Sequence, residues 1–390
     1  MHPENTKIFG VYNKKMQIYV HIPFCKSKCR YCDFNSCACR DKQAIFDYLN
    51  VLNHEISLAS RSFADAKIDT VYVGGGTPSL LEEEHARFLF DCLHDSFDLK
   101  SLKEFTIECN PESINQKKLT LYKECGVNRI SIGVQSLFDD NLKIIGRLHD
   151  FQTAIEKIKL ARKYFDNVSA DLIIGLPFDT KERIAQEVET LAPLVDHLSM
   201  YELSVEDGTA LEKMIEKGVI SIPDDDATQD LFDVAIDTAL GCGFERYEVS
   251  NFAKNGKISI HNFGYWQREE YLGFGAGAHS FLTTSNGADL LKNQTRFANF
   301  RSLKEYEKAV NCAKTYADIN RDFCEYLTEK YVKEEEIMLA LRTKRGVKSE
   351  MLPNIGDNLE KFFERKDGYV SLTREGIAVM NSILVEILDI

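Results

Sequence analysis

The 390-residue sequence has no long uninterrupted hydrophobic run, because its 44% of hydrophobic residues are interspersed with 28% of charged residues. No stretch reaches the roughly 18 apolar residues that indicate a membrane-spanning helix. The first residues also contain no apolar segment of signal-peptide length and nothing that resembles a cleavage site. These absences predict a cytoplasmic protein.

Basic residues are comparatively scarce. Lys and Arg total 48 against 61 Asp and Glu, which gives a formal net charge of −13. Such a balance disfavours a long groove for a phosphate backbone. Nucleic acid is therefore not an expected partner.

Cysteine, by contrast, is plentiful, with eleven in the chain. We expect free thiols, because disulfides are uncommon in the cytoplasm and a chain of this length does not need them for stability. The cysteines scattered singly are expected to be small buried side chains. They are Cys92, Cys109, Cys125, Cys242, Cys312 and Cys324.

Short runs of β-branched and aromatic residues recur along the first half of the chain, and each is followed by a helical pattern. Strands are predicted at 17–22, 70–76, 104–111, 129–136, 169–177 and 197–204. Apolar strands that alternate with helices indicate an α/β fold with a parallel sheet. Six units are few for a closed eight-stranded barrel, so we predict a partial (β/α)6 barrel whose site lies at the C-terminal ends of the strands.

After about residue 205 this alternation ends, and the sequence predicts further regions. A segment dense in glycine, aromatic residues and histidine is expected to form a functional loop system, and a charged amphipathic helix, a strand pair and a last helix follow it. The expected organisation is an N-terminal extension (1–16), the barrel (17–240), the glycine- and aromatic-rich region (241–317), and a small winged-helix-like C-terminal domain (318–390).

Three cysteines stand together directly after the first predicted strand. In "YVHIPFCKSKCRYCDF" they are Cys25, Cys29 and Cys32, and Phe34 occupies a position where a fourth cysteine could have stood. A structural zinc site takes four ligands, and a [4Fe–4S] cluster usually takes four cysteines. The triplet therefore predicts a cluster with one open iron, with buried or zinc-binding cysteines as the alternative.

The spacing C-x3-C-x2-C after strand one resembles the signature of radical S-adenosylmethionine (SAM) proteins. This resemblance implies that the methionine end of SAM chelates the open iron, and that electron transfer cleaves a C–S bond of SAM to give a 5′-deoxyadenosyl radical. The stretch "GGGTP", residues 74–78, closes the second strand and is similar to the glycine motif of that family. Glycines there let backbone groups approach a ligand closely.

The motifs "YVHIPFC", "GGGTP", "IECNP", "GVQS", "DLIIGLP" and "GFGAGAHS" together resemble the oxygen-independent coproporphyrinogen III oxidase group of radical SAM proteins. The resemblance implies that Cys25, Cys29 and Cys32 bind the cluster. It implies SAM contacts at Tyr19, Tyr31, Gly75, Gly76, Thr77, Glu108, Gln135, Arg147 and Asp171. A second SAM is implied at Gly76, Thr77, Gln135, Arg147 and Asp171, so one or two molecules are expected.

Two features separate the chain from the oxidases and are similar to their HemW branch. The oxidases carry a further cysteine where this chain has Phe34, and the segment "HNFGYW", residues 261–266, is similar to a HemW motif. That branch is understood as heme chaperones, which implies heme as a ligand. An imidazole can bind heme iron and aromatic rings can contact a porphyrin, so His261, Tyr265 and Trp266 are candidate heme residues. The alternative is a structural loop.

For three other residues the sequence allows more than one role. Cys37 and Cys39 are expected to be ordinary thiols, and a role in cluster exchange or heme contact is the alternative. His279, in "GAHS", is expected to be a packing residue, and heme contact is again the alternative.

The sequence thus predicts a heme chaperone that delivers heme to respiratory hemoproteins, with the coproporphyrinogen oxidase as the competing enzyme. A zinc-binding regulatory scaffold is the third alternative. The expected partners are heme, SAM, recipient hemoproteins and a ferritin-like heme donor. A homodimer and a transient association with membranes through partners are further expectations.

Overall fold

A computed structural model describes residues 15–39, 41–283 and 294–388. Most of the predicted N-terminal extension (1–16) and ten residues of the glycine- and aromatic-rich region lie outside this part of the chain. Within it, no helix is both long and apolar enough to cross a membrane.

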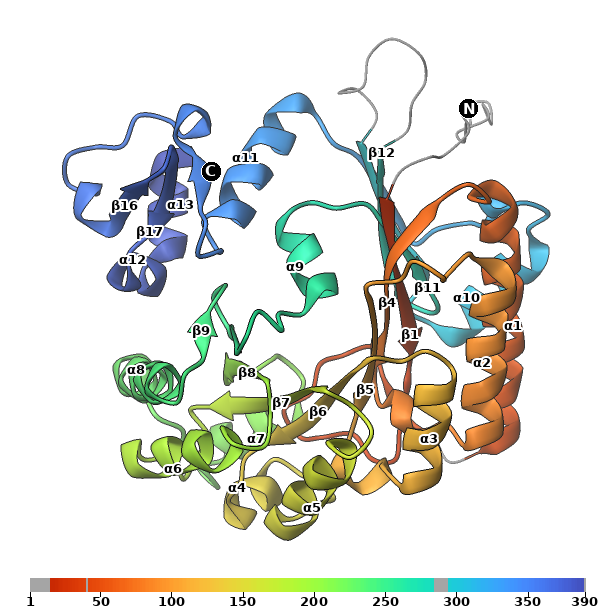
Figure 1. Cartoon of the computed structure of the whole chain (residues 1–390), viewed down its shortest axis with the longest axis horizontal. Helices are drawn as coiled ribbons and strands as arrows, with labels where there is room; N and C mark the ends of the chain where they lie inside the picture. The colour runs from red at the N-terminus through yellow and green to blue at the C-terminus, as the bar shows by residue number, and fades with distance from the viewer. Residues whose placement is uncertain (1–14, 40, 284–293, 389–390) are drawn as a thin grey trace.

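Six parallel strands form the centre of a twelve-stranded sheet, as the sequence predicts. In sheet order they are β1 (Lys15–Ile22), β4 (Lys67–Gly75), β5 (Glu104–Cys109), β6 (Arg129–Gln135), β7 (Asn167–Ile174) and β8 (His197–Glu202). The sheet curves into an open barrel with helices on its outer side (Figure 1). The carboxyl ends of these strands therefore lie along one rim.

The remaining strands extend this sheet beyond both of its ends. Next to β1 lie β11 (Tyr271–Phe274), β12 (His279–Thr283), β13 (Gln294–Ala298) and β14 (Phe323–Tyr326); next to β8 lie β10 (Asn251–Ala253) and β9 (Glu245–Arg246). A separate short pair is β2 (Phe24–Cys25) with β3 (Cys37–Ala38). The extension from β11 to β14 adds four strands on the side of β1.

Several of the barrel helices begin at a side chain that accepts hydrogen bonds from the first backbone N–H groups, as N-caps do. Asp41, Asn115, Asp150, Thr180 and Asp224 have this role. The helices are α1 (Lys42–Ser62), α2 (Glu83–Ser96), α3 (Gln116–Glu124), α4 (Asp139–Ile144), α5 (Phe151–Ala161), α6 (Lys181–Leu191), α7 (Ala210–Glu216), α8 (Asp225–Gly241), α9 (Ile260–Trp266) and α10 (Leu303–Cys312). Short 3-10 turns are Pro78–Leu80, Pro111–Ser113, Tyr316–Asp318, Ser349–Met351 and Glu360–Phe362.

One large apolar core lies between the sheet and the outer helices. Phe90 of α2, for example, packs edge-on against Phe105 of β5 and Tyr122 of α3, and all three are buried. The inner face of the strands is more polar than this core and includes the buried residues Gln17 and Thr70. This division leaves polar side chains to face the interior of the barrel.

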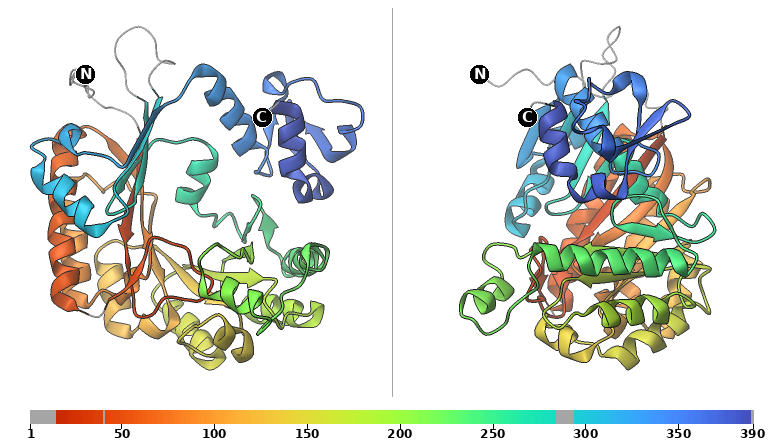
Figure 2. Two further views of the ribbon diagram at one scale, coloured as in Figure 1. Left: turned by 180° about the vertical axis from the view of Figure 1, so that it is seen from behind. Right: turned by 90° about the vertical axis from the view of Figure 1, so that its left-hand side faces the viewer.

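The C-terminal residues form a smaller unit with its own core (Figure 2). It contains α11 (Glu329–Ala340), an antiparallel sheet of β15 (Val347–Lys348), β17 (Tyr369–Leu372) and β16 (Phe363–Lys366), then α12 (Arg374–Ala378) and α13 (Met380–Leu388). The predicted strand pair and last helix are present, and β15 adds a strand that the sequence pattern does not indicate.

Two expectations about local structure are wrong. The segment around residue 261 is the helix α9, which lies on the inner side of the curved sheet, whereas a loop was expected (Figure 1). Ser259 caps this helix, and Glu104 accepts hydrogen bonds from the N–H groups of Ile260 and His261. Of the cysteines expected to be buried, Cys312 and Cys324 are exposed, because they lie at a helix end and on an edge strand.

Candidate functional site

The cysteine triplet lies on a loop between β2 and β3. Cys25 ends β2 and is buried, whereas Cys29 and Cys32 lie in the loop and are half-buried. The N–H of Cys32 donates to the carbonyl of Cys29, and the N–H of Cys39 donates to the carbonyl of Cys25 at 3.0 Å. The parallel pairing of β2 with β3 closes the loop that carries the three thiols.

Two side chains from outside this loop donate hydrogen bonds to the sulfurs: Thr77 follows β4, and Arg147 lies between α4 and α5. The Thr77 hydroxyl donates to Cys25 Sγ at 3.5 Å, and the Arg147 guanidinium donates to Cys29 Sγ at 3.6 Å. Hydrogen bonds to sulfur orient cysteine ligands and tune metal sites. The environment therefore suits sulfur ligands.

Gly76, directly after β4, lets this part of the chain approach the cysteine loop closely. A Cβ atom at Gly76 would lie 2.9 Å from Cys25 Sγ and 2.8 Å from the carbonyl oxygen of Phe24. The N–H of Gly76 donates to Ile22, and the N–H of Thr77 donates to Phe24, both at 2.8 Å. The glycine motif thus fits tightly against the first thiol.

The three thiols line a cavity of about 640 Å³ at the rim of the barrel. Of the residues expected to contact SAM, the ones that line this cavity are Tyr31, Gly75, Gly76, Thr77, Glu108, Gln135, Arg147 and Asp171. Tyr19 does not line it and faces a neighbouring cavity. The sequence-based set therefore comes together in space, apart from one tyrosine.

The cavity contains two buried carboxyl groups. Burial raises the pKa of Glu108 to about 7, although Tyr72 donates to it at 2.7 Å and the N–H of Gly75 donates at 3.1 Å. Burial also raises the pKa of Asp171, against hydrogen bonds from Ser199 and Ser131. Acceptors of this kind suit the hydroxyl and amino groups of a polar ligand.

Sequence reasoning missed several polar residues of the cavity. Asn110 donates to the Thr77 hydroxyl at 3.2 Å and accepts from Arg147 at 2.9 Å, so it connects the glycine turn with the guanidinium. Ser131 and Ser199 line the cavity from β6 and β8. Both serines could have been found in the sequence, because each stands in an otherwise apolar strand. Side chains alternate along a strand, so a serine between outward-pointing apolar residues points into the barrel.

Gln135 has a backbone conformation that non-glycine residues seldom adopt. Its φ is +70°, and the register between β6 and β7 shifts between Gly133 and Gln135. A left-handed backbone conformation at a non-glycine residue costs about 1 to 3 kcal/mol and is often found at functional sites. Here the irregularity places Gln135 at the wall of the cavity.

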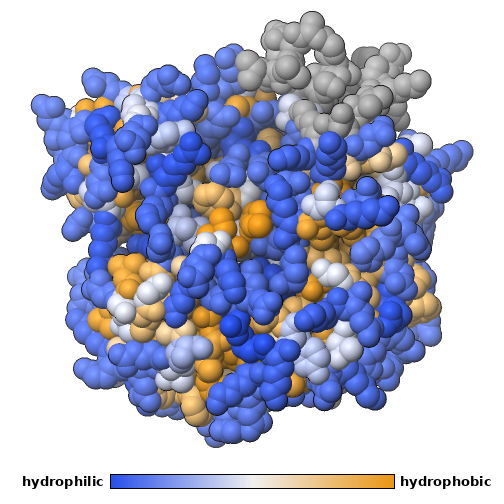
Figure 3. Space-filling view, viewed as in Figure 1, coloured by the Kyte–Doolittle hydropathy of each residue, from blue (hydrophilic) through white to orange (hydrophobic). Residues whose placement is uncertain are grey.

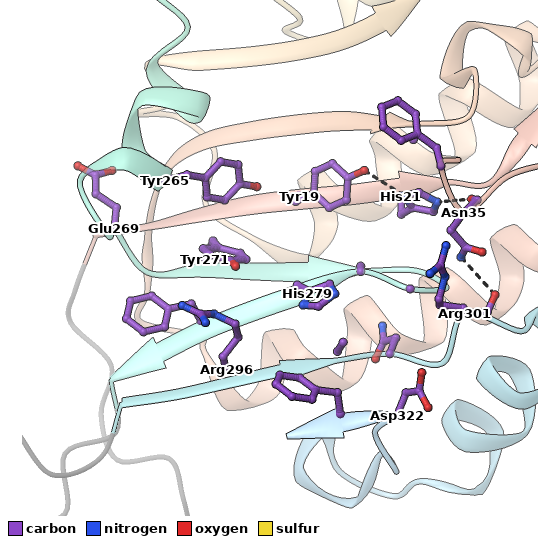
Figure 4. A pocket seen from close by; sticks show the side chains of 18 of the residues that line it. Tyr19, His21, Asn35, Tyr265, Glu269, Tyr271, His279, Arg296, Arg301 and Asp322 are labelled. Carbon is purple, nitrogen blue, oxygen red and sulfur yellow. Dashed lines mark hydrogen bonds between the residues drawn. The ribbon is translucent and has the colours of Figure 1, made fainter. Parts of the chain in front are cut away.

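A second cavity, of about 890 Å³, lies beside the first on the extended sheet (Figure 4). Aromatic and cationic side chains line it, including Tyr265, Tyr271, Phe281 and Arg301. The two cavities share wall residues, namely Asp33, Phe34, Gly75 and Glu108. In the space-filling view the molecule is hollowed near its centre, where hydrophobic residues are exposed (Figure 3).

The candidate heme residues of α9 do not form one surface. His261 is fully buried; its Nδ1 is 2.8 Å from the Thr70 hydroxyl, its Nε2 is 2.9 Å from the Tyr265 hydroxyl, and its ring stacks on Tyr72. Tyr265 lines the second cavity, and Trp266 lines neither of the two. An iron-binding role for His261 stays a prediction, and it requires the Tyr265 hydrogen bond to break.

Cys37 and Cys39 lie next to the triplet in sequence but line neither of these cavities. Cys37 is exposed, and Cys39 packs against the large core. Their positions favour ordinary thiols over a role in either site.

Comparisons with known proteins identify the class to which this fold and site belong. The model of the radical SAM superfamily matches residues 19–191. The solved structure of coproporphyrinogen III oxidase (HemN) from Escherichia coli, described as a radical SAM enzyme, aligns with a TM-score of 0.80 over 97% of this chain and 91% of that chain, at 20% identity. The chain therefore has the fold of that structure over almost its whole length.

More similar sequences narrow the class to one family. The heme chaperone HemW of Bacillus subtilis is 35% identical over 349 residues, which cover 88% of each chain. HemW of Escherichia coli is 36% identical and aligns with 72% of this chain and 74% of its own. A mitochondrial radical SAM domain-containing protein 1 of Mus musculus is 34% identical, with 85% of this chain and 74% of that protein covered. The chain belongs to the HemW family of the radical SAM superfamily.

Proposed function

We propose that Cys25, Cys29 and Cys32 bind a [4Fe–4S] cluster and that the 640 Å³ cavity binds SAM. The donor set fits, because three thiols share one cavity and receive hydrogen bonds from Thr77 and Arg147. Each thiolate of a cluster binds a different iron, so three ligands leave one iron for a small chelating molecule. A cluster held by Cys25, Cys29 and Cys32 would supply the electron for reductive cleavage of SAM.

We further propose that the protein is a heme chaperone, which binds heme and delivers it to respiratory hemoproteins. The observation that carries this proposal is the second cavity, which lies beside the cluster cavity in a chain of the HemW family. Its volume is within the range of about 300 to 1,000 Å³ that is typical of ligand sites. Aromatic walls and cationic side chains suit a flat molecule that carries carboxylates.

Phe34 supports chaperone function over oxidase function. It stands where the oxidases carry a further cysteine, and its side chain is 67% exposed at the wall between the two cavities. A phenyl ring there offers apolar contact area in place of a sulfur. We propose a cytoplasmic location, with the heme recipient and a ferritin-like donor as protein partners.

Anaerobic reconstitution with iron and sulfide tests the cluster. We expect the iron and acid-labile sulfide of one [4Fe–4S] cluster per chain, and we expect Cys25→Ser to lose most of both. Cys312→Ser is the matched control, since Cys312 is exposed and far from the triplet in sequence, and it should keep the cluster. Zinc without sulfide in the purified protein would instead support the zinc-binding scaffold.

Two assays on the reconstituted protein then separate chaperone from enzyme. A heme titration followed at the Soret band should show tight, saturable binding. Incubation with SAM, a reductant and coproporphyrinogen III should form no protoporphyrinogen IX. Catalytic formation of that product would overturn the chaperone proposal in favour of the oxidase.

A further inference from the structure

A row of side chains crosses the extended sheet at the floor of the second cavity. Tyr19 of β1 pairs with Gly273 of β11, His279 of β12 pairs with Ala298 of β13, and Ala298 pairs with Phe323 of β14. Gly273 and His279 are adjacent across the antiparallel β11–β12 pair. Paired residues project from the same face of a sheet, so these side chains stand in one line.

His279 is prominent in this row because its neighbours are small. Gly273 lies on one side and Ala298 on the other, so the next larger groups are Tyr19 and Phe323 at the ends of the row. A Cβ at Gly273 would lie 1.9 Å from the His279 carbonyl oxygen, which requires glycine there. The result is an imidazole on an open floor, near the middle of the cavity view (Figure 4).

The imidazole of His279 is accessible to a ligand in the second cavity. The side chain is exposed in the cavity, and none of the described residues forms a hydrogen bond with its ring. Partial burial, together with the cations Arg296 and Arg301, lowers the pKa of His279 and favours the neutral imidazole. A neutral imidazole is the form that coordinates iron.

The other histidines near this cavity lack such freedom. His21 Nδ1 is 2.9 Å from the Tyr19 hydroxyl, and its Nε2 is 2.8 Å from the Asn35 carbonyl oxygen. Both ring nitrogens of His261 have hydrogen-bond partners. Burial raises the pKa of Tyr19 and Tyr265 well above the ordinary value, which disfavours a phenolate as the iron ligand.

Among the residues that the structure describes, Arg301 is a cation of the cavity with no carboxylate partner. Arg268 and Arg296 both form ion pairs with Glu335. Arg301 is exposed and forms no ion pair with any residue in the described part of the chain, and it lies on the opposite side of His279 from Arg296 (Figure 4). A guanidinium in this state is available to a ligand carboxylate.

We propose that the second cavity is the heme site, with His279 as the axial iron ligand and Arg301 as the partner of a heme propionate. This inference rests on the proposed chaperone function and names the residues through which it acts. The alternative ligand is His261, which the sequence motif suggests.

Paired titrations with heme and with metal-free protoporphyrin IX test the inference in the full-length protein. His279→Ala should weaken heme binding by about tenfold or more and change the Soret band. Its affinity for protoporphyrin IX should stay unchanged, because that molecule has no iron. Free imidazole should restore the wild-type heme spectrum, which a merely structural role of His279 would not allow. Arg301→Ala should weaken the binding of both molecules by a similar factor.

His94→Ala is the matched control, since His94 lies on α2 and bonds to the Cys125 carbonyl outside either cavity. Thermal unfolding checks that each variant folds. If wild-type protein binds no heme, the chaperone proposal fails. If wild-type protein binds heme and His279→Ala keeps its affinity and spectrum, the inference about His279 is wrong while the chaperone proposal stands.

Discussion

Replacing Gly76 by alanine is the most direct test of how the glycine motif supports the cysteine loop. The added methyl group would lie 2.9 Å from Cys25 Sγ and 2.8 Å from the carbonyl oxygen of Phe24. Cβ atoms in folded proteins essentially never come this close to another heavy atom. The contact with Phe24 involves backbone, so no side-chain rotation relieves it. The two segments must therefore move apart.

The expected loss of stability in Gly76→Ala follows from overpacking at a rigid contact. Inserting a methyl group into a well-packed position typically costs about 1 to 3 kcal/mol. We expect a loss of this size in the unfolding free energy of the apoprotein. The separation also moves Cys25 Sγ relative to the other two thiols, so the variant should retain less iron and sulfide after reconstitution.

Gly241→Ala provides the matched control. Gly241 ends α8, and a Cβ there meets no atom within 4 Å. Alanine at that position should leave the cluster unchanged and should stabilise the protein by up to about 1 kcal/mol. Urea denaturation and iron and sulfide analysis measure both effects. If Gly76→Ala matches the wild type in stability and in cluster content, the glycine motif does not support Cys25 as argued.

Two further predictions concern buried ionisable groups. Burial raises the pKa of Glu187 to about 8, so its contribution to stability is fully present below about pH 4.5 and is lost as the pH rises towards 8. At about 1.36 kcal/mol per pKa unit, the wild-type protein should lose roughly 3 to 5 kcal/mol of unfolding free energy over this pH range. Urea unfolding at pH 5 and pH 8 should show that Glu187→Gln lacks this loss. The same pH dependence in the variant and the wild type would contradict the prediction. His261→Ala should lower the unfolding free energy by about 2 to 4 kcal/mol, because the buried hydroxyls of Thr70 and Tyr265 lose a partner. Its heme affinity should stay at the wild-type level in a Soret titration, and a large loss would restore His261 as the candidate ligand.

The barrel and the first cavity could be predicted because their signals are local in sequence. Each strand is a short β-branched run, and polar residues such as Glu108 and Gln135 follow directly at its end. Parallel strands bring such ends to one rim. The three cysteines lie within eight residues, so their proximity required no knowledge of the fold.

The second cavity could not be predicted because it depends on pairing between distant segments. Tyr19 faces it only because β1 pairs with β11, which is about 250 residues further along the chain. The strands that form its floor have only four or five residues each, and short strands of this kind give no clear periodicity. The exposed position of His279 in this cavity depends on this register, so the sequence alone favoured simple packing.

The helix α9 was missed for a different reason. Its seven residues include Gly264 and four aromatic or histidine rings, which are weak helix formers. Gly264 is needed because a Cβ there would overlap the amide of Gln17 on β1. Tertiary contact with the sheet therefore fixes this helix, and the same contact buries His261.

Phe34 lies at the wall that the two cavities share. Its side chain is 67% exposed although phenylalanine is strongly apolar, and it lines both cavities. Full burial of such a side chain stabilises by about 1.5 to 3 kcal/mol, so ligands that cover the exposed part would gain about 1 to 2 kcal/mol. A cysteine at this position would bring a possible sulfur ligand but much less apolar area. Phenylalanine at residue 34 thus provides apolar surface beside the cysteine triplet in place of a thiol.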